Sequence, residues 1–359
     1  MKIVRSMTFR VASIALASLL TAGIAAQAQQ SEDTVVRRHI TVTQSDLAAA
    51  AGVKNNYYHV TPANLPGARE AAMKLNGESD KRLARTLPNA EAVPRLPNAL
   101  TAPYFYPADL AKGSGAALKT VVNHAVYVDY TGTIAANWGN PEGFLNDLGK
   151  STFIHLVDQY AGVTTNGRYT VGANASVTYG FYGNTLYEHE LWAIAHSVAK
   201  TDGAGTGHIY HIFLPAGVDT CFDQSTACYS PDNTNNFYFC AYHSSVTFSD
   251  IGTVLFSVEP YQLTPGCQVA TPSPNGQLAD STNSVLSHEL FEAITDPIVG
   301  NGWTNHTSTP MGGSEIGDEC HTAGDGAGNN LAPTFLINGK SYEVQTEYSN
   351  HYHACATTP

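Results

Sequence analysis

Residues Ser287 to Pro297 read SHELFEAITDP, and they carry the most distinctive pattern of charges in the sequence. At about 100° per residue around a helix axis, His288, Glu292 and Asp296 fall on one arc, with Glu289 beside them. Apolar residues occupy the opposite arc, namely Leu286, Leu290, Ala293 and Ile294. This arrangement predicts a helix that packs with one face and presents three acidic side chains and a histidine on the other.

The acidic side chains of this helix are crowded. Glu289 and Glu292 are neighbours on a helix surface, as are Glu292 and Asp296, so each pair repels by a few tenths of a kcal/mol when exposed. No Lys or Arg nearby offsets the repulsion, but a bound cation would. His288 and Glu292 stand one turn apart, which is the spacing by which a helix presents two ligands to one ion. The alternative is a solvated acidic face with an incidental histidine.

A second acidic segment follows downstream, where residues 314–319 read SEIGDE beside Cys320 and His321. Two side chains on one helix supply only part of the ligands of a metal ion, so further ligands must come from another part of the chain. Glu315 or Asp318 could complete the site.

The segment resembles the active helix of the zincin metallopeptidases, which reads His-Glu-x-x-His. The resemblance implies that His288, Glu292 and Glu315 are metal ligands and that Glu289 is the base that polarises a metal-bound water. It also implies a set of alternative ligands, or of groups that orient the ligands: Asp296, Asp318 and His321.

The sequence departs from the zincin pattern at Glu292, where the family has a second histidine. Two carboxylates and one imidazole bind zinc less tightly than two imidazoles and one carboxylate, and they favour harder ions. The expected cofactor is therefore a divalent metal, with zinc as the first choice and calcium as another. The expected reaction is hydrolysis of an extracellular peptide or protein by a metal-activated water.

Another resemblance covers more of the chain. Residues Phe237 to His243, Cys267, Pro274 to Gly276 and Ala293 to Pro297 are similar to the EXORDIUM-like, phosphate-induced secreted family. This resemblance implies an extracellular protein linked to growth, with no established reaction. It supports the alternative function, a non-catalytic extracellular or cell-surface interaction protein.

The N-terminus predicts export. Basic residues precede an apolar stretch from Val11 to Ala26, which ends in the small-residue pattern of Ala26 to Ala28. Residues 1–28 are therefore expected to be a secretory signal peptide, the alternative being a short N-terminal anchor. The protein is then secreted, to the extracellular space or the periplasm, and the mature chain is not integral to a membrane.

Six cysteines in an exported chain predict three disulfides. Proximity in the sequence suggests three pairs: Cys221 with Cys228, Cys240 with Cys267, and Cys320 with Cys355.

Charge divides the chain near Lys119. Of the 18 Lys and Arg residues, 14 lie at or before Lys119, whereas residues 120–359 hold 22 of the 30 acidic residues. An acidic field repels phosphate backbones, so no nucleic-acid partner is expected. We expect residues 120–359 to form an acidic metal-binding domain. Residues 29–119, rich in proline, are expected to form a basic pro-segment that docks on it or a plain linker.

Strand-like and helical segments occur together in the acidic half without regular alternation. Strands are predicted at Ala125 to Tyr130, His208 to Leu214, Asn236 to Tyr242 and Thr253 to Val258. Helices are predicted at Leu186 to Val198 and from Ser281 or Thr282 to Asp296. Composition excludes a disordered polyelectrolyte, because 43% of the residues are hydrophobic and only 13% are charged. The expected fold is α+β, with a zincin-like mixed sheet packed on an active-site helix and stabilised by disulfides.

Overall fold

The computed structural model describes residues 37–53, 55–65, 67–68, 70–72, 74–76, 109–128, 138–179, 184–222, 227–305, 315–321 and 332–359. Residues 36–359 form one compact unit. The predicted signal peptide lies outside the described residues. No helix among the described residues is long and apolar enough to cross a membrane.

The fold is built on a mixed sheet of eight strands, which confirms the α+β prediction. In spatial order the strands are β1 (Arg37–Thr41), β6 (Asn174–Thr178), β4 (Val121–Val128), β8 (His208–Phe213), β12 (Gly252–Glu259), β11 (Phe239–Phe248) and β2 (Asn55–Pro62), and β5 (Tyr169–Val171) also pairs with β4. Neighbours from β1 to β12 run parallel. The hairpin of β11 and β12 and the pairing of β2 with β11 are antiparallel.

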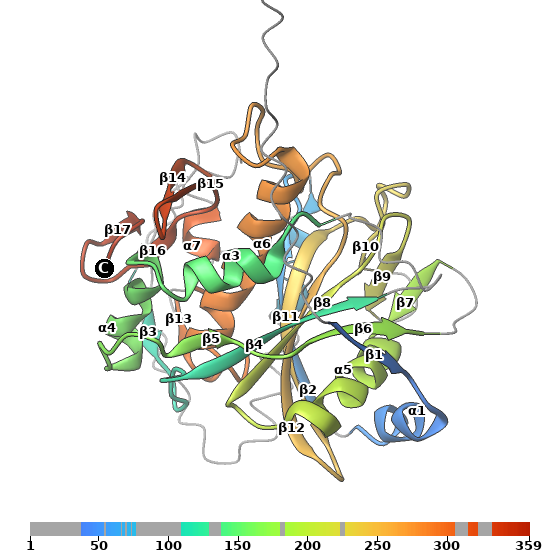
Figure 1. Ribbon diagram of the computed structural model, residues 1–359. Coiled ribbons are helices and arrows are strands. Elements are labelled where there is room, and N and C mark those ends of the chain that lie inside the picture. The colour runs from blue at the N-terminus through green and yellow to red at the C-terminus, as the bar shows by residue number, and fades with distance from the viewer. Residues whose placement is uncertain are drawn as a thin grey trace, which may run out of the picture. The chain divides into compact units, whose positions relative to one another are not determined.

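Hydrophobic clusters cover both faces of the sheet. Side chains alternate along β4, so Val126 and Val128 join one cluster while Ala125 and Tyr127 join the other. The first cluster packs against α1 (Gln44–Ala51) and α5 (Glu188–Asp202), and the second against α3 (Pro141–Leu148), the 3-10 helix η1 (Phe153–Val157), α4 (Asp158–Ala161) and α6 (Gln277–Thr295). Figure 1 shows α5 and α6 on different sides of the central strands.

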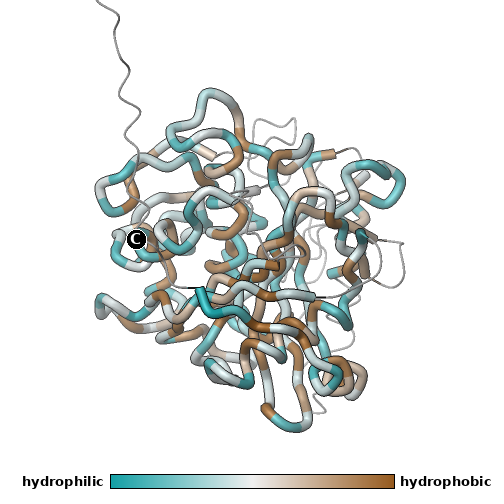
Figure 2. The backbone as a smooth tube through the Cα atoms, turned by 45° about the vertical axis from the view of Figure 1, so that its right-hand side comes forward, coloured by the Kyte–Doolittle hydropathy of each residue, from teal (hydrophilic) through white to brown (hydrophobic). Residues whose placement is uncertain are grey.

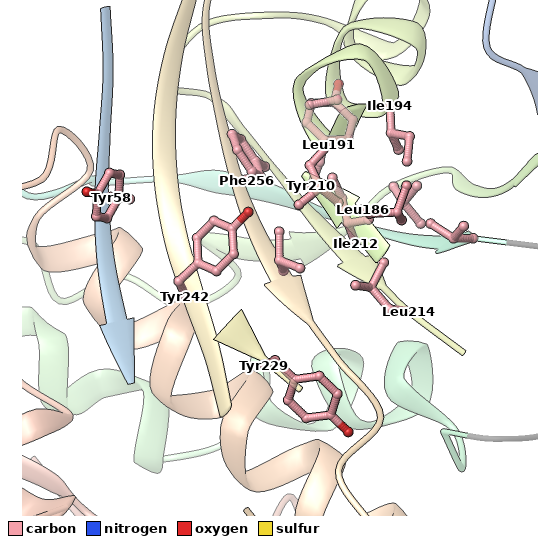
Figure 3. Close-up of a cluster of buried hydrophobic side chains, with 14 of the residues drawn as sticks. Tyr58, Leu186, Leu191, Ile194, Tyr210, Ile212, Leu214, Tyr229, Tyr242 and Phe256 are labelled. Carbon is pink, nitrogen blue, oxygen red and sulfur yellow. The ribbon is translucent and has the colours of Figure 1, made fainter. Parts of the chain in front are cut away.

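The first cluster is strongly aromatic. Tyr58, Tyr242 and Phe256 come from three adjacent strands and lie on the same side of the sheet as Leu191 and Ile194 of α5 (Figure 3). Hydrophobic segments gather in the interior, while many outer loops are hydrophilic (Figure 2). The second face of the sheet is less uniformly apolar beneath α6. Buried polar residues lie there on β2 and β11, among them His59 and His243.

Helix α6 confirms the predicted helix but begins earlier than expected. Ser281 and Thr282 are not capping residues, because their hydroxyls donate to the carbonyls of Gln277 and Leu278 inside the helix. The N-terminus is instead held by Asp280, whose carboxylate accepts from the backbone and side-chain nitrogens of Asn275. The helix ends at Thr295, two residues before Pro297.

The remaining elements are short. They are β3 (Ala111–Lys112), β7 (Thr185–Tyr187), β9 (Asp219–Phe222), β10 (Ala227–Tyr229), β13 (Trp303–Thr304), α7 (Asp318–His321), β14 (Thr334–Ile337), β15 (Lys340–Glu343), β16 (Glu347–Ser349) and β17 (Ala354–Ala356). Most pair into small sheets beside the central one. Helix α7 carries the downstream acidic segment and lies near α6 in Figure 1.

All three predicted disulfides are present: Cys221 with Cys228, Cys240 with Cys267, and Cys320 with Cys355. The second closes the segment that follows β12 onto the start of β11. The third ties α7 to β17, close to the acidic segment.

Strands β1 and β2 come from the segment for which the charge pattern predicts a pro-segment or a linker. β1 pairs with β6 along five residues, and β2 pairs with β11 along most of its length. Cleavage of residues 29–119 stays a prediction, but strands from both sides of Lys119 belong to one sheet. Composition alone could not show this, because the pairing is made between residues far apart in the chain.

Candidate metal centre

The acidic face of α6 lies against a polar region of the sheet. His59 of β2 and His243 of β11 are paired directly across the two strands, and their rings stack with centroids 5.9 Å apart. Both histidines are buried, as are His288, Glu289 and Glu292 of α6. The side chains of two neighbouring strands and one helix thus form a buried polar cluster inside the molecule.

A first group of potential ligands consists of His59, Glu292 and Asp318. Each offers one atom, and these atoms all lie within 4.8 Å of one another. Nε2 of His59 lies 2.5 Å from Oδ2 of Asp318. Oε1 of Glu292 accepts a hydrogen bond from the backbone nitrogen of Asp318 at 3.3 Å. The segment containing α7 therefore brings its carboxylate to both the sheet and α6.

A second group consists of His243, Glu289 and Glu292, again with ligand atoms within 4.8 Å of one another. Nδ1 of His243 lies 3.4 Å from Oε2 of Glu289 and 3.4 Å from Oε2 of Glu292. The other oxygen of Glu289 accepts a hydrogen bond from the hydroxyl of Thr61, next to His59 on the same face of β2. Glu292 belongs to both groups.

Glu315 lies between the two histidines. Its Oε1 is 3.2 Å from Nδ1 of His59, and its Oε2 is 3.6 Å from Nε2 of His243. The same carboxylate thus faces an imidazole from each of the two groups. This position agrees with the prediction that Glu315 lies beside the acidic face of α6, and it places the carboxylate next to two histidines of the sheet that the zincin pattern does not include.

His288 contacts the centre at Glu292, because Nε2 of His288 lies 3.0 Å from Oε1 of Glu292. Its other ring nitrogen lies 3.3 Å from Oε1 of Gln345, and Gln345 also donates to the carbonyl of Gly317 at 2.6 Å. Gly317 packs directly on the ring, since a Cβ at this position would lie 2.5 Å from Nδ1 of His288. Gln345 and Gly317 together fix the orientation of the imidazole.

The buried histidines and carboxylates of the centre shift one another's pKa values. Burial disfavours the charged form of His243, but the carboxylates of Glu289 and Glu292 outweigh burial and raise its pKa to about 9. Burial likewise opposes ionisation of His288 and Glu292. Their attraction for each other outweighs it, raising the pKa of His288 and lowering the pKa of Glu292 well below its usual value. Burial raises the pKa of Glu289.

Several buried polar atoms of the centre have no hydrogen-bond partner among the described residues. They are both ring nitrogens of His243 and Oε2 of both Glu289 and Glu292. Contacts of 3.4 Å between these atoms are longer than a well-formed N–H···O bond. Buried polar atoms are normally satisfied, so a cluster of such atoms around one point is what a bound cation would explain.

The structure brings together five of the residues predicted for the site, namely His288, Glu289, Glu292, Glu315 and Asp318. It does not place Asp296 there. The carboxylate of Asp296 instead accepts from the backbone nitrogens of Gly300, Asn301 and Gly302 and so closes the turn after α6. His321 ends α7, and its side chain is outside what the structure describes.

Sequence reasoning missed three polar residues of the centre, His59, His243 and Glu347. Glu347 of β16 is fully buried, and burial raises its pKa well above the usual value. His243 alternates with Ala241, Ser245 and Thr247 along one face of β11, and polar residues predominate on this face of a strand that is almost entirely buried. A polar face on a strand between apolar segments was the available signal. Nothing in the local sequence pairs His243 with His59, because their contact depends on the register of two distant strands.

A cleft of about 640 Å³ lies beside His288 at the edge of the centre. Thr61, His288 and Gln345 contribute to its lining, together with the segment Pro265 to Thr271 and Glu343. The Cys240 to Cys267 disulfide forms part of one wall. The cleft provides a place for a ligand next to His288.

Comparisons of the chain with family models, with curated proteins and with solved structures find no match.

Proposed function

We propose that the protein is an exported metal-dependent hydrolase, similar in chemistry to a metallopeptidase, that acts on extracellular peptides or proteins. The observation that carries the proposal is the enclosure of His59, His243 and Glu292 with further carboxylates at one buried point. Ionised groups are costly to bury without compensation, and a divalent cation supplies it. The three disulfides support export.

A divalent cation held here would supply a nucleophile by lowering the pKa of its bound water. The cleft beside His288 would admit the substrate to that water. The imidazoles favour zinc, but the ligands include more carboxylates than a usual zinc peptidase site, so harder ions such as calcium would compete with zinc.

Glu289 contributes in one of two ways. As a base, it would take the proton of the metal-bound water, as the zincin resemblance implies. As a ligand, it would bind the ion itself, which its distance of 3.4 Å from His243 and its membership of the second group support. The Glu289→Gln variant distinguishes the two roles, because a base can be replaced without losing metal and a ligand cannot.

A non-catalytic extracellular or cell-surface interaction protein is the second candidate. The observation that favours it is the burial of the centre, since His243 is only 1% exposed and Glu292 is 0% exposed. Closed sites are typical of structural metals, whereas catalytic sites keep an open position. In this case the metal would hold α6 against the sheet, and the protein would catalyse no reaction.

The test combines metal analysis with hydrolysis of a library of unstructured peptides by the purified protein. We expect bound divalent metal, hydrolysis that a chelator abolishes, and a loss of about 10²- to 10⁴-fold in Glu289→Gln. Glu142→Gln is the matched control, because Glu142 is a buried glutamate that pairs with Arg37, outside the cleft and both groups. Metal without hydrolysis in the wild type would favour the second candidate, and absence of bound metal would overturn both.

A further inference from the structure

We propose that the centre holds two divalent cations and that Glu292 bridges them. The inference rests on the proposed metal site and adds a second ion to it. Glu292 belongs to both groups of potential ligands, whereas His59 and His243 fall in different groups. One shared carboxylate between two histidine-containing groups is the arrangement expected of a binuclear centre.

The two oxygens of Glu292 face different groups. Oε1 lies beside His288 and accepts from the backbone of Asp318, on the side of the first group. Oε2 lies 3.4 Å from Nδ1 of His243, on the side of the second group. A carboxylate with its oxygens directed this way can bind one ion through each oxygen, and its fixed position on α6 holds the two ions at a constant separation.

Charge balance also favours two ions. Four buried carboxylates lie 2.5 to 3.4 Å from a histidine nitrogen of the centre, those of Glu289, Glu292, Glu315 and Asp318. They carry four negative charges when they bind metal, and histidine ligands must be neutral. Two divalent cations carry the charge that balances these four, whereas one cation carries half of it. In the part of the chain that the structure describes, Glu289, Glu292 and Asp318 make no ion pair with Lys or Arg.

The second ion has an independent indication in His243. This side chain is 1% exposed, and neither ring nitrogen has a hydrogen-bond partner in the part of the chain that the structure describes. Nδ1 points between Glu289 and Glu292, at equal distances of 3.4 Å. An ion among these three residues would bind Nδ1 of the imidazole and Oε2 of each carboxylate, and it would make Glu289 a ligand.

Metal content should be measured on the full-length protein loaded with Zn²⁺ and, separately, with Mn²⁺. We expect about two equivalents in the wild type, about one in His59→Asn and in His243→Asn, and about two in the control His196→Asn. His196 is a suitable control because it is also buried between two carboxylates, Asp46 and Asp250, away from the centre.

The electron paramagnetic resonance spectrum of the Mn²⁺-loaded wild type tests whether two bridged ions are bound, and it needs no substitution. Two ions joined by one carboxylate should give an exchange-coupled spectrum. A single uncoupled ion would overturn the binuclear centre and leave the proposed hydrolase standing. Two uncoupled ions would also overturn the bridge, and absence of bound metal would overturn both proposals.

Discussion

At the scale of single residues, the geometry of the candidate metal centre depends on close packing around its potential ligands. Gly317 follows Ile316, which is fully buried, and precedes Asp318, which contacts His59. The glycine is needed because the ring of His288 occupies the space where a side chain would be. A short segment therefore anchors itself in the core, makes room for one imidazole and supplies a carboxylate.

Substitution of Gly317 by alanine should displace the His288 ring. We expect Gly317→Ala to weaken metal affinity by about 10- to 100-fold, the effect typical of losing a group that orients a ligand. Overpacking should also destabilise the fold by about 1 to 3 kcal/mol. Metal titration and thermal unfolding measure the two effects.

Gly207→Ala is the control for this prediction. A Cβ at Gly207 would meet nothing within 4 Å, and its backbone needs no positive φ. Equal metal affinity in the two alanine variants would show that the space beside His288 is not essential.

At the scale of elements, α1 is joined to α5 by a buried carboxylate. Asp46 accepts hydrogen bonds from the backbone and hydroxyl of Thr43, which cap α1, and from the ammonium of Lys200. Its other close contact is His196 of α5, at 2.8 Å. Burial raises the pKa of Asp46, but Lys200 and Thr43 outweigh it and lower the pKa from 3.8 to about 2.

This shift predicts a pH dependence of stability. A lowered folded-state pKa stabilises the protein above the unfolded value, and the stabilisation is lost as the pH falls towards the folded value. Asp46→Asn should therefore cost about 1 to 3 kcal/mol near neutral pH, and its difference from the wild type should shrink as the pH falls from about 4 to about 2.

Urea unfolding at several pH values measures this difference. The exposed Asp232 provides the control, since Asp232→Asn should change the free energy of unfolding by less than about 0.5 kcal/mol. A pH-independent loss in Asp46→Asn would assign its effect to packing or capping instead of charge.

At the scale of the whole molecule, segments from both ends of the chain form the centre. His59 comes from β2 in the first part of the chain, His243 from β11 further along, and Asp318 from α7 in the C-terminal part. β2 pairs with β11 through an extended register. The region before Lys119 therefore contributes a strand to the sheet and a histidine to the centre.

Cleavage within residues 77–108 should leave the two fragments associated. A site-specific protease sequence inserted there allows the chain to be nicked after folding, and size-exclusion chromatography then tests whether the fragments elute together. We expect co-elution with metal retained, because β1 and β2 stay hydrogen-bonded in the sheet. Release of the N-terminal fragment with metal still bound to the remainder would contradict a role for His59.

The amino-acid sequence determined that residues 277–295 are mostly helical, that this helix has an acidic and histidine face, that a second acidic segment follows around Glu315, and that the cysteines form three disulfides. These features are local, because helical periodicity and neighbouring cysteines are visible within a few turns or loops of chain. Only the tertiary structure brought His59 opposite His243, assigned Asp296 to a turn, and divided the ligands into two groups around Glu292. Strand register joins residues that are far apart in the chain, and no local pattern encodes which side chains then become neighbours.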